Sequence, residues 1–222
     1  AGWRRCHNPD DARMSVLDLT AIDAAPLQQD PFDFMVARDV IRADVITQLN
    51  RDYPEIDKPA NYSPKDLEYG PSFRQLLEEL DSPEFEQHVA SKFNVDLTGA
   101  IKTITVRRFS EPSDGNIHTD HWSKLITVLV YFNTDWDEQS GQLRLLRSAT
   151  DLEDYAAEVP PAGGTLLAFR RTDDSWHGHK RFIGERRMLQ LNFIRTSKTA
   201  RCTQQLARFS TRMMKRVARL VQ

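Results

Sequence analysis

After Asn94 the apolar residues change from a helical spacing to an extended one, and this change constrains the fold more than any other feature. Several short apolar segments follow one another from Ile101 to Ile194, each with the content or the two-residue alternation of a strand. Turn-forming residues separate these segments, without a helix-length insertion. The predicted strands are residues 101–109, 125–132, 142–146, 164–169, 176–182 and 188–194. Strands in direct succession predict an antiparallel sandwich or barrel.

The residues before Asn94 predict one strand and three helices. Residues 32–36 alternate as in a half-buried strand, and Ser82 stands where it can cap the last of the helices. Residues 57–71 contain three prolines and predict a long loop. The helices are expected over residues 40–53, 73–80 and 85–93. Helices followed by strands predict that the helices pack on one outer face of the β core.

We therefore expect an α+β, mainly β chain in four parts. Residues 1–30 form a loosely ordered lead-in with a short helix near Asp18, and residues 31–97 hold the strand and helices that support the core. Residues 98–196 form the β core, and residues 197–222 form a basic C-terminal helix. A chain of 222 residues can bury such a core without disulfides or structural zinc.

Charge is divided unevenly along the chain. Residues 1–185 carry 20 Lys and Arg against 32 Asp and Glu, whereas residues 186–222 carry 10 Lys and Arg and no acidic residue. The C-terminal helix either packs its apolar stripe on the domain with its charges in water, or docks onto an anionic surface such as a membrane leaflet or a glycan. Nucleic acid is not favoured as a partner, because the tail lacks the aromatic interleaving of a stacking platform.

Few features of the sequence bear on the cellular location of the protein or on redox chemistry. The longest apolar run, Leu125 to Phe132, has eight residues, and a membrane span needs roughly 18. No charged-then-apolar leader is visible, and Cys6 and Cys202 match no metal or redox spacing. We expect a cytoplasmic protein without a transmembrane segment, peripheral at a membrane surface if the basic tail docks there.

His118 and Asp120 are the first candidate site residues. They lie two residues apart before a strong strand, so in an extended chain their side chains project to the same face. One imidazole and one carboxylate make two-thirds of the 2-His-1-carboxylate triad that binds Fe(II), and His177 in a later strand supplies a second imidazole. His179 shares the strand parity of His177 and stays an alternative. Three protein ligands leave coordination positions open for reactants.

Arg186 and Arg187 are the candidates for binding an anion. They follow His177 by nine and ten residues and open the last predicted strand. A guanidinium there offers a fixed fork for a carboxylate. Only one of two consecutive strand residues can face inward, so strand geometry leaves the choice between them open.

These residues belong to an ordered set that resembles the 2-oxoglutarate and Fe(II)-dependent dioxygenases, in their prolyl-4-hydroxylase-like branch. The resemblance spans roughly residues 100–196 and lies in the order and spacing of six blocks. The blocks are His118-Thr119-Asp120, Tyr131 to Trp136, Gly141-Gln142-Leu143, Pro161 to Phe169, Ser175 to Gly178 and Gly184-Glu185-Arg186.

The resemblance implies a double-stranded β-helix (jelly roll) core that binds Fe(II) and 2-oxoglutarate. It assigns the metal to His118, Asp120 and His177, because the spacing to the family's arginine favours His177 over His179.

The family's G-x-R register assigns 2-oxoglutarate to Arg186 rather than Arg187. Family members often have a tyrosine at the far carboxylate of 2-oxoglutarate, and Val130 stands at that position here, so we expect Val130 to line the cosubstrate site. His121 is expected to be structural or to face the substrate.

The implied reaction is hydroxylation of an unactivated C–H, with release of succinate and CO2 and with ascorbate as a reductant. The substrate stays open among small molecules, glycans and protein side chains, because a fold does not choose between them. Candidate pocket residues are Tyr62, Tyr69, Trp122 and Lys124. The alternative is a non-catalytic, cupin-like jelly roll that binds a metal or ligand. A metal-dependent hydrolase is not favoured, because the sequence has no second metal cluster.

Overall fold

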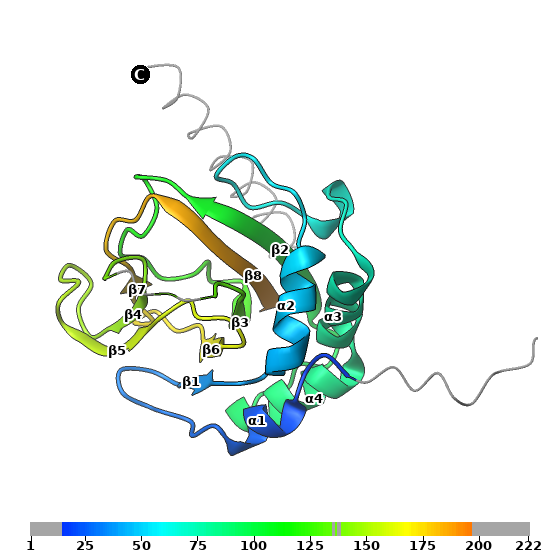
Figure 1. Cartoon of the computed structure of the whole chain (residues 1–222). Coiled ribbons are helices and arrows are strands. Elements are labelled where there is room, and N and C mark those ends of the chain that lie inside the picture. Colours follow the sequence, from blue (N-terminus) through cyan, green and yellow to red (C-terminus); the bar gives the residue numbers. More distant parts are fainter. Residues whose placement is uncertain (1–14, 135, 137–138, 197–222) are drawn as a thin grey trace, which may run out of the picture.

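The structure is a computed structural model that describes residues 15–134, 136 and 139–196. Two antiparallel sheets form its centre, and helices pack along one side of the larger sheet (Figure 1). The expected basic helix over residues 197–222 and the first half of the expected lead-in lie outside the described residues.

The larger sheet has five strands in the order β1-β6-β3-β8-β2, and every pairing in it is antiparallel. Its strands are β1 (Phe34–Ala37), β2 (Ile101–Ser110), β3 (Lys124–Tyr131), β6 (Leu166–Arg170) and β8 (Gly184–Ile194). The central strand β3 pairs with β6 on one side and β8 on the other. A bulge interrupts the β2–β8 ladder between Arg107 and Phe109.

The smaller sheet has the strand order β5-β4-β7. Its strands are β4 (Leu143–Leu146), β5 (Tyr155–Val159) and β7 (His177–Gly178). An apolar cluster lies between the two sheets, formed by Phe32, Phe34, Leu129, Tyr131, Leu143, Leu145, Val159, Leu167, Phe169 and Met188. The two sheets are therefore packed face to face around this cluster.

The helices cover the opposite face of the larger sheet. They are α1 (Leu19–Ala24), α2 (Ala43–Arg51), α3 (Pro71–Asp81) and α4 (Pro83–Phe93), with a 3-10 turn η1 (Pro64–Asp66) in the long loop. Their apolar side chains join those of Val128, Val130, Leu189 and Leu191 in the main core. Alternate residues of β3 and β8 thus face the helices and the smaller sheet, as the period of a strand requires.

Local sequence signals account for several element boundaries. Ser82 accepts a hydrogen bond from the N–H of Phe85 at 3.1 Å and caps α4, as the sequence predicts. Asn94 ends α4 in the left-handed region, with φ 45°.

Three expectations are corrected by the structure. Residues 15–30 are not a loose lead-in, because Val16, Leu17 and Ile22 are buried in the main core. Strand β5 is not predicted by the sequence, since two of its five residues are alanines. The expected strand over residues 176–182 is limited to the two residues of β7.

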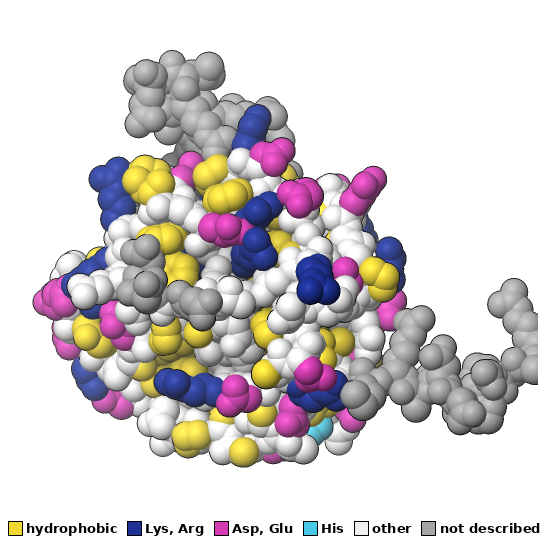
Figure 2. Space-filling view, in the orientation of Figure 1, with side chains coloured by type: hydrophobic (Ala, Val, Ile, Leu, Met, Phe, Trp, Pro, Cys, Tyr) yellow, Lys and Arg dark blue, Asp and Glu magenta, His cyan; other side chains and the backbone are white. Residues whose placement is uncertain are grey.

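On the face shown in Figure 2, basic and acidic side chains are interspersed. Among the described residues, none of the helices has the length and apolar character needed to span a membrane.

Candidate metal and cosubstrate site

The structure brings His118 and His177 together through a short backbone pairing. The N–H of His118 donates to the carbonyl of His177 at 3.0 Å, and the N–H of His177 donates back at 2.9 Å. Two glycines allow this close approach. A Cβ on Gly178 would lie 2.8 Å from the carbonyl oxygen of Gly115, and a Cβ on Gly115, whose φ is +88°, would lie 2.5 Å from that of His179.

Both histidines are held in the tautomer that a metal ligand needs. Nδ1 of His118 lies 2.8 Å from the carbonyl oxygen of Asn116, and Nδ1 of His177 lies 2.9 Å from that of Ser175. A carbonyl only accepts, so Nδ1 carries a proton in each ring, and Nε2 is the nitrogen that remains for a metal. Burial lowers the pKa of His177 to about 4, which keeps this ring neutral at neutral pH.

Asp120 completes the cluster. The ligand atoms of His118, Asp120 and His177 all lie within 4.8 Å of one another. The carboxylate of Asp120 is 9% exposed and accepts from Nζ of Lys124 and from Oγ1 of Thr127, each at 2.5 Å. Burial by itself would raise the pKa of Asp120, but the charge of Lys124 and these hydrogen bonds hold it well below its ordinary value. Asp120 is therefore ionised.

Arg186 lies in the same cleft, which has a volume of about 1170 Å³. Its guanidinium is 4% exposed and donates to the carbonyl of Gly141 at 2.8 Å, and one of its nitrogens lies 3.4 Å from the hydroxyl of Tyr131. Among the described residues, no carboxylate forms an ion pair with it. The walls near this end of the cleft are apolar, with Leu129, Leu143, Phe169 and Met188. An unpaired buried guanidinium fits a ligand that brings its own carboxylate.

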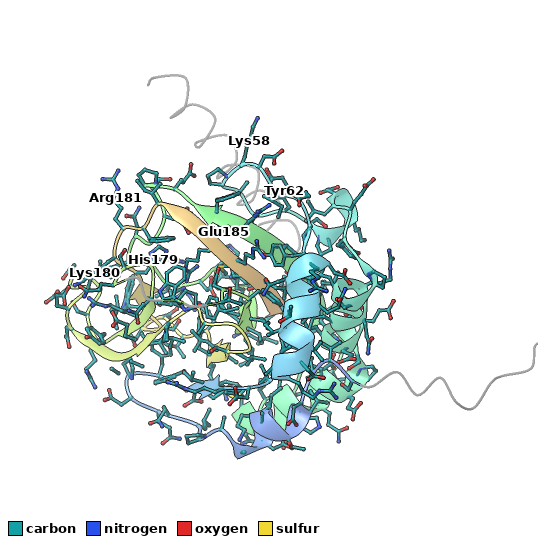
Figure 3. All side chains as sticks on the ribbon, viewed as in Figure 1. Lys58, Tyr62, His179, Lys180, Arg181 and Glu185 are labelled. Carbon is teal, nitrogen blue, oxygen red and sulfur yellow. The ribbon has the colours of Figure 1, made fainter. Side chains whose placement is uncertain are left out.

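Arg107 is a second guanidinium that lines the cleft, and it already has a partner. It forms an ion pair with Asp114 and donates to the carbonyl of Phe109 at 2.7 Å. His179 lies just after β7 (Figure 3). It also lines the cleft, and its Nδ1 lies 2.8 Å from the carbonyl oxygen of Lys180. Burial and the charge of Arg186 lower the pKa of His179 to about 4. His179 is outside the ligand cluster, so the structure favours His177 over His179 as the candidate metal ligand.

The structure corrects the expectation for Val130. Its side chain is fully buried in the main core on the helix side of β3, and it does not line the cleft. The next residue, Tyr131, faces the other way and meets Arg186. Both faces of β3 are covered, so apolar residues stand on both of them, and only Thr127, which has the parity of Tyr131 and not of Val130, marks the face toward the cleft.

The other predicted neighbours lie apart from the ligand cluster. Arg187 points out of the cleft, where Nε lies 2.6 Å from Glu185 and a terminal nitrogen lies 3.0 Å from the side chain of Asn50. His121 contacts the hydroxyl of Ser123 at 2.8 Å. Trp122 is 43% exposed and does not line the cleft.

Sequence reasoning missed the partners of Asp120. Thr127 points into the cleft from the middle of β3, and Lys124, considered only as a general pocket residue, contacts the carboxylate directly. The alternation of polar Thr127 within an apolar run is the one signal that could have pointed to the first of these contacts.

The donor set fits a divalent metal with open coordination positions. Two neutral imidazoles and one carboxylate on one side of an ion are the ligands of non-haem Fe(II) sites. The buried Arg186 without a carboxylate partner fits a dicarboxylate cosubstrate in the same cleft. These two features together fit an open metal site with room for a carboxylate ligand rather than a closed structural metal site.

Comparison with known proteins agrees with this geometry. Residues 105–195 match the family model of the 2OG-Fe(II) oxygenase superfamily. A prolyl-4-hydroxylase from Pseudomonas putida has a similar structure, with 17% sequence identity, a TM-score of 0.54 and coverage of 80% of this chain and 92% of that chain. A structure of prolyl 4-hydroxylases from Phytophthora capsici has 16% identity and a TM-score of 0.51, over 83% of this chain and 65% of that one. No curated protein sequence matches the chain.

Residues 105–195, which hold the candidate metal and cosubstrate site, are therefore similar to the 2OG-Fe(II) oxygenase superfamily. The fold of the chain is the one seen in the prolyl-4-hydroxylase-like branch.

Proposed function

We propose that this protein is an Fe(II)- and 2-oxoglutarate-dependent dioxygenase that hydroxylates an unactivated C–H of its substrate. One substrate C–H, one O2 and one 2-oxoglutarate give one C–OH, one succinate and one CO2. The observation that carries the proposal is the combination of the His118, Asp120 and His177 cluster with the unpaired Arg186 in one cleft. We also infer that the two packed sheets are the halves of a double-stranded β-helix.

The residues of the chain have separate tasks in this proposal. His118, Asp120 and His177 hold the metal, which with 2-oxoglutarate supplies the O2-activating chemistry. Arg186 would hold the far carboxylate of the cosubstrate, and the hydroxyl of Tyr131, which lies 3.4 Å from a guanidinium nitrogen of Arg186, would help to orient that guanidinium. The apolar wall formed by Leu129, Leu143, Phe169 and Met188 would exclude water from the methylene groups of the cosubstrate.

The proposal is tested by anaerobic loading with Fe(II) and 2-oxoglutarate, followed by O2 in the presence of ascorbate to keep the iron reduced. Succinate is measured by mass spectrometry without added substrate. We expect iron-dependent succinate from the wild-type protein and none from Asp120→Ala. A protein that binds both iron and 2-oxoglutarate but forms no succinate above the metal-free control would instead be a non-catalytic binding module.

A further inference from the structure

Lys124 is a buried lysine in direct contact with the proposed metal ligand. It begins β3 and lies 2.5 Å from Oδ1 of Asp120, with side-chain exposures of 11% and 9% for the two residues. Among the described residues, Asp120 is the only carboxylate that forms an ion pair with Lys124. The ammonium lines the cleft together with Thr127 and Asn192.

Among the described residues, the other acidic side chains that line the cleft form no ion pair with Lys124. Asp114 pairs with Arg107, Asp81 lies 3.7 Å from Lys102, and Glu78 comes within ion-pairing distance of neither Lys102 nor Lys124.

A metal at Asp120 leaves the site with one surplus positive charge. The two charges of Fe(II) are balanced by Asp120 and by the keto-acid carboxylate of 2-oxoglutarate. The far carboxylate of the cosubstrate balances Arg186, and Asp114 balances Arg107. Whichever oxygen of Asp120 binds the metal, the single negative charge of this carboxylate is then shared between Fe(II) and the ammonium of Lys124. The ammonium of Lys124 is left without a counter-charge of its own, and a buried charge without a partner is unfavourable.

We propose that the substrate carries a carboxylate that pairs with Lys124, and that the hydroxylated C–H lies within a few bonds of this carboxylate. The inference rests on the proposed function. A carboxylate matches one surplus charge, whereas a phosphate monoester would bring nearly two negative charges. The closeness of Lys124 to Asp120 places the anion beside the metal. Thr127 and Asn192 add uncharged polar groups to the same wall.

Acetate and its neutral isostere acetamide test the proposal. The protein is loaded with Mn(II) and 2-oxoglutarate under argon, and the paramagnetic relaxation of each methyl group is measured by proton NMR. We expect at least about a tenfold greater relaxation of acetate than of acetamide in the wild-type protein. Lys124→Met should abolish this difference. Lys65→Met is the matched control, because Lys65 is an exposed lysine that lines the same cleft from η1, and it should keep the difference.

Several outcomes would overturn the inference. They are no relaxation of acetate in the wild-type protein, equal relaxation of acetate and acetamide, or an acetate effect that persists in Lys124→Met and therefore arises on the metal itself. The wild-type comparison needs no variant, so a folding defect of Lys124→Met leaves the test intact. Succinate formation reports separately on the proposed function: if it fails in the wild type, the proposed function fails, whatever acetate does.

Discussion

The two adjacent arginines at the start of β8 allow the cosubstrate site to be tested with a matched pair of variants. Arg186 points into the cleft and Arg187 points to the opposite side, where it contacts Glu185 and Asn50. Methionine keeps much of the length and volume of the arginine stem and removes the guanidinium. We predict that Arg186→Met raises the apparent KM for 2-oxoglutarate and that Arg187→Met does not.

The size of the effect follows from burial. Removing one partner of a buried, hydrogen-bonded charge pair costs about 2–5 kcal/mol of binding free energy. At about 1.4 kcal/mol for each factor of ten, the apparent KM should rise from about 30-fold to several thousand-fold. The free energy of unfolding should change by only about 1 kcal/mol without cosubstrate. The loss of the hydrogen bond to Gly141 is then offset by removal of an unpaired buried charge.

The assay is succinate formation over a range of 2-oxoglutarate concentrations, with urea unfolding and Mn(II) affinity measured on the same samples. Mn(II) affinity should stay unchanged in both variants, because neither arginine contacts the three ligands. The reasoning is refuted if Arg186→Met keeps the apparent KM within about threefold of the wild type, or if Arg187→Met raises it instead.

Three other perturbations have defined outcomes. Asp120→Ala should abolish both Mn(II) binding, followed by electron paramagnetic resonance, and succinate formation; substantial turnover with alanine there would show that the ligand assignment is wrong. Gly115→Ala should lower the free energy of unfolding in urea by about 2 kcal/mol or more and weaken Mn(II) binding, because its φ is +88° and the new Cβ would meet the backbone of His179; unchanged stability and affinity would contradict the packing argument. Without metal, stability should fall between about pH 6.5 and pH 4, by up to about 1.4 kcal/mol per pH unit for each of His177 and His179. Their folded pKa values are lowered to about 4, so below pH 6.5 only the unfolded chain takes up their protons. Urea unfolding at pH 7 and pH 5 measures this, and His179→Gln should reduce the drop; a flat profile would refute it.

Local patterns in the sequence account for much of the architecture. Helical spacing and capping residues place α3 and α4 within a few residues of their observed bounds. The two-residue period predicts most strands of the larger sheet and puts His118 and Asp120 on one face. These features depend on residues close together in the chain, so they can be predicted without knowing which strands pair.

The long-range contacts were decided by tertiary packing. Strand parity alone does not distinguish His177 from His179, and in the structure His177 pairs with His118 and belongs to the ligand cluster whereas His179 does not. The choice between Val130 and Tyr131 depends on which face of β3 meets the smaller sheet, and in a strand covered on both faces the single polar residue Thr127 is a weak sign of it.

The contact between Lys124 and Asp120 arises in the same way. The chain turns at His121, whose carbonyl accepts from the N–H of Lys124 at 3.0 Å, and this turn folds the lysine back onto the carboxylate. Residue types and spacing therefore indicate which chemistry the chain can perform. Only the packing of strands distant in sequence decides which side chains meet, because register and burial are properties of the whole fold.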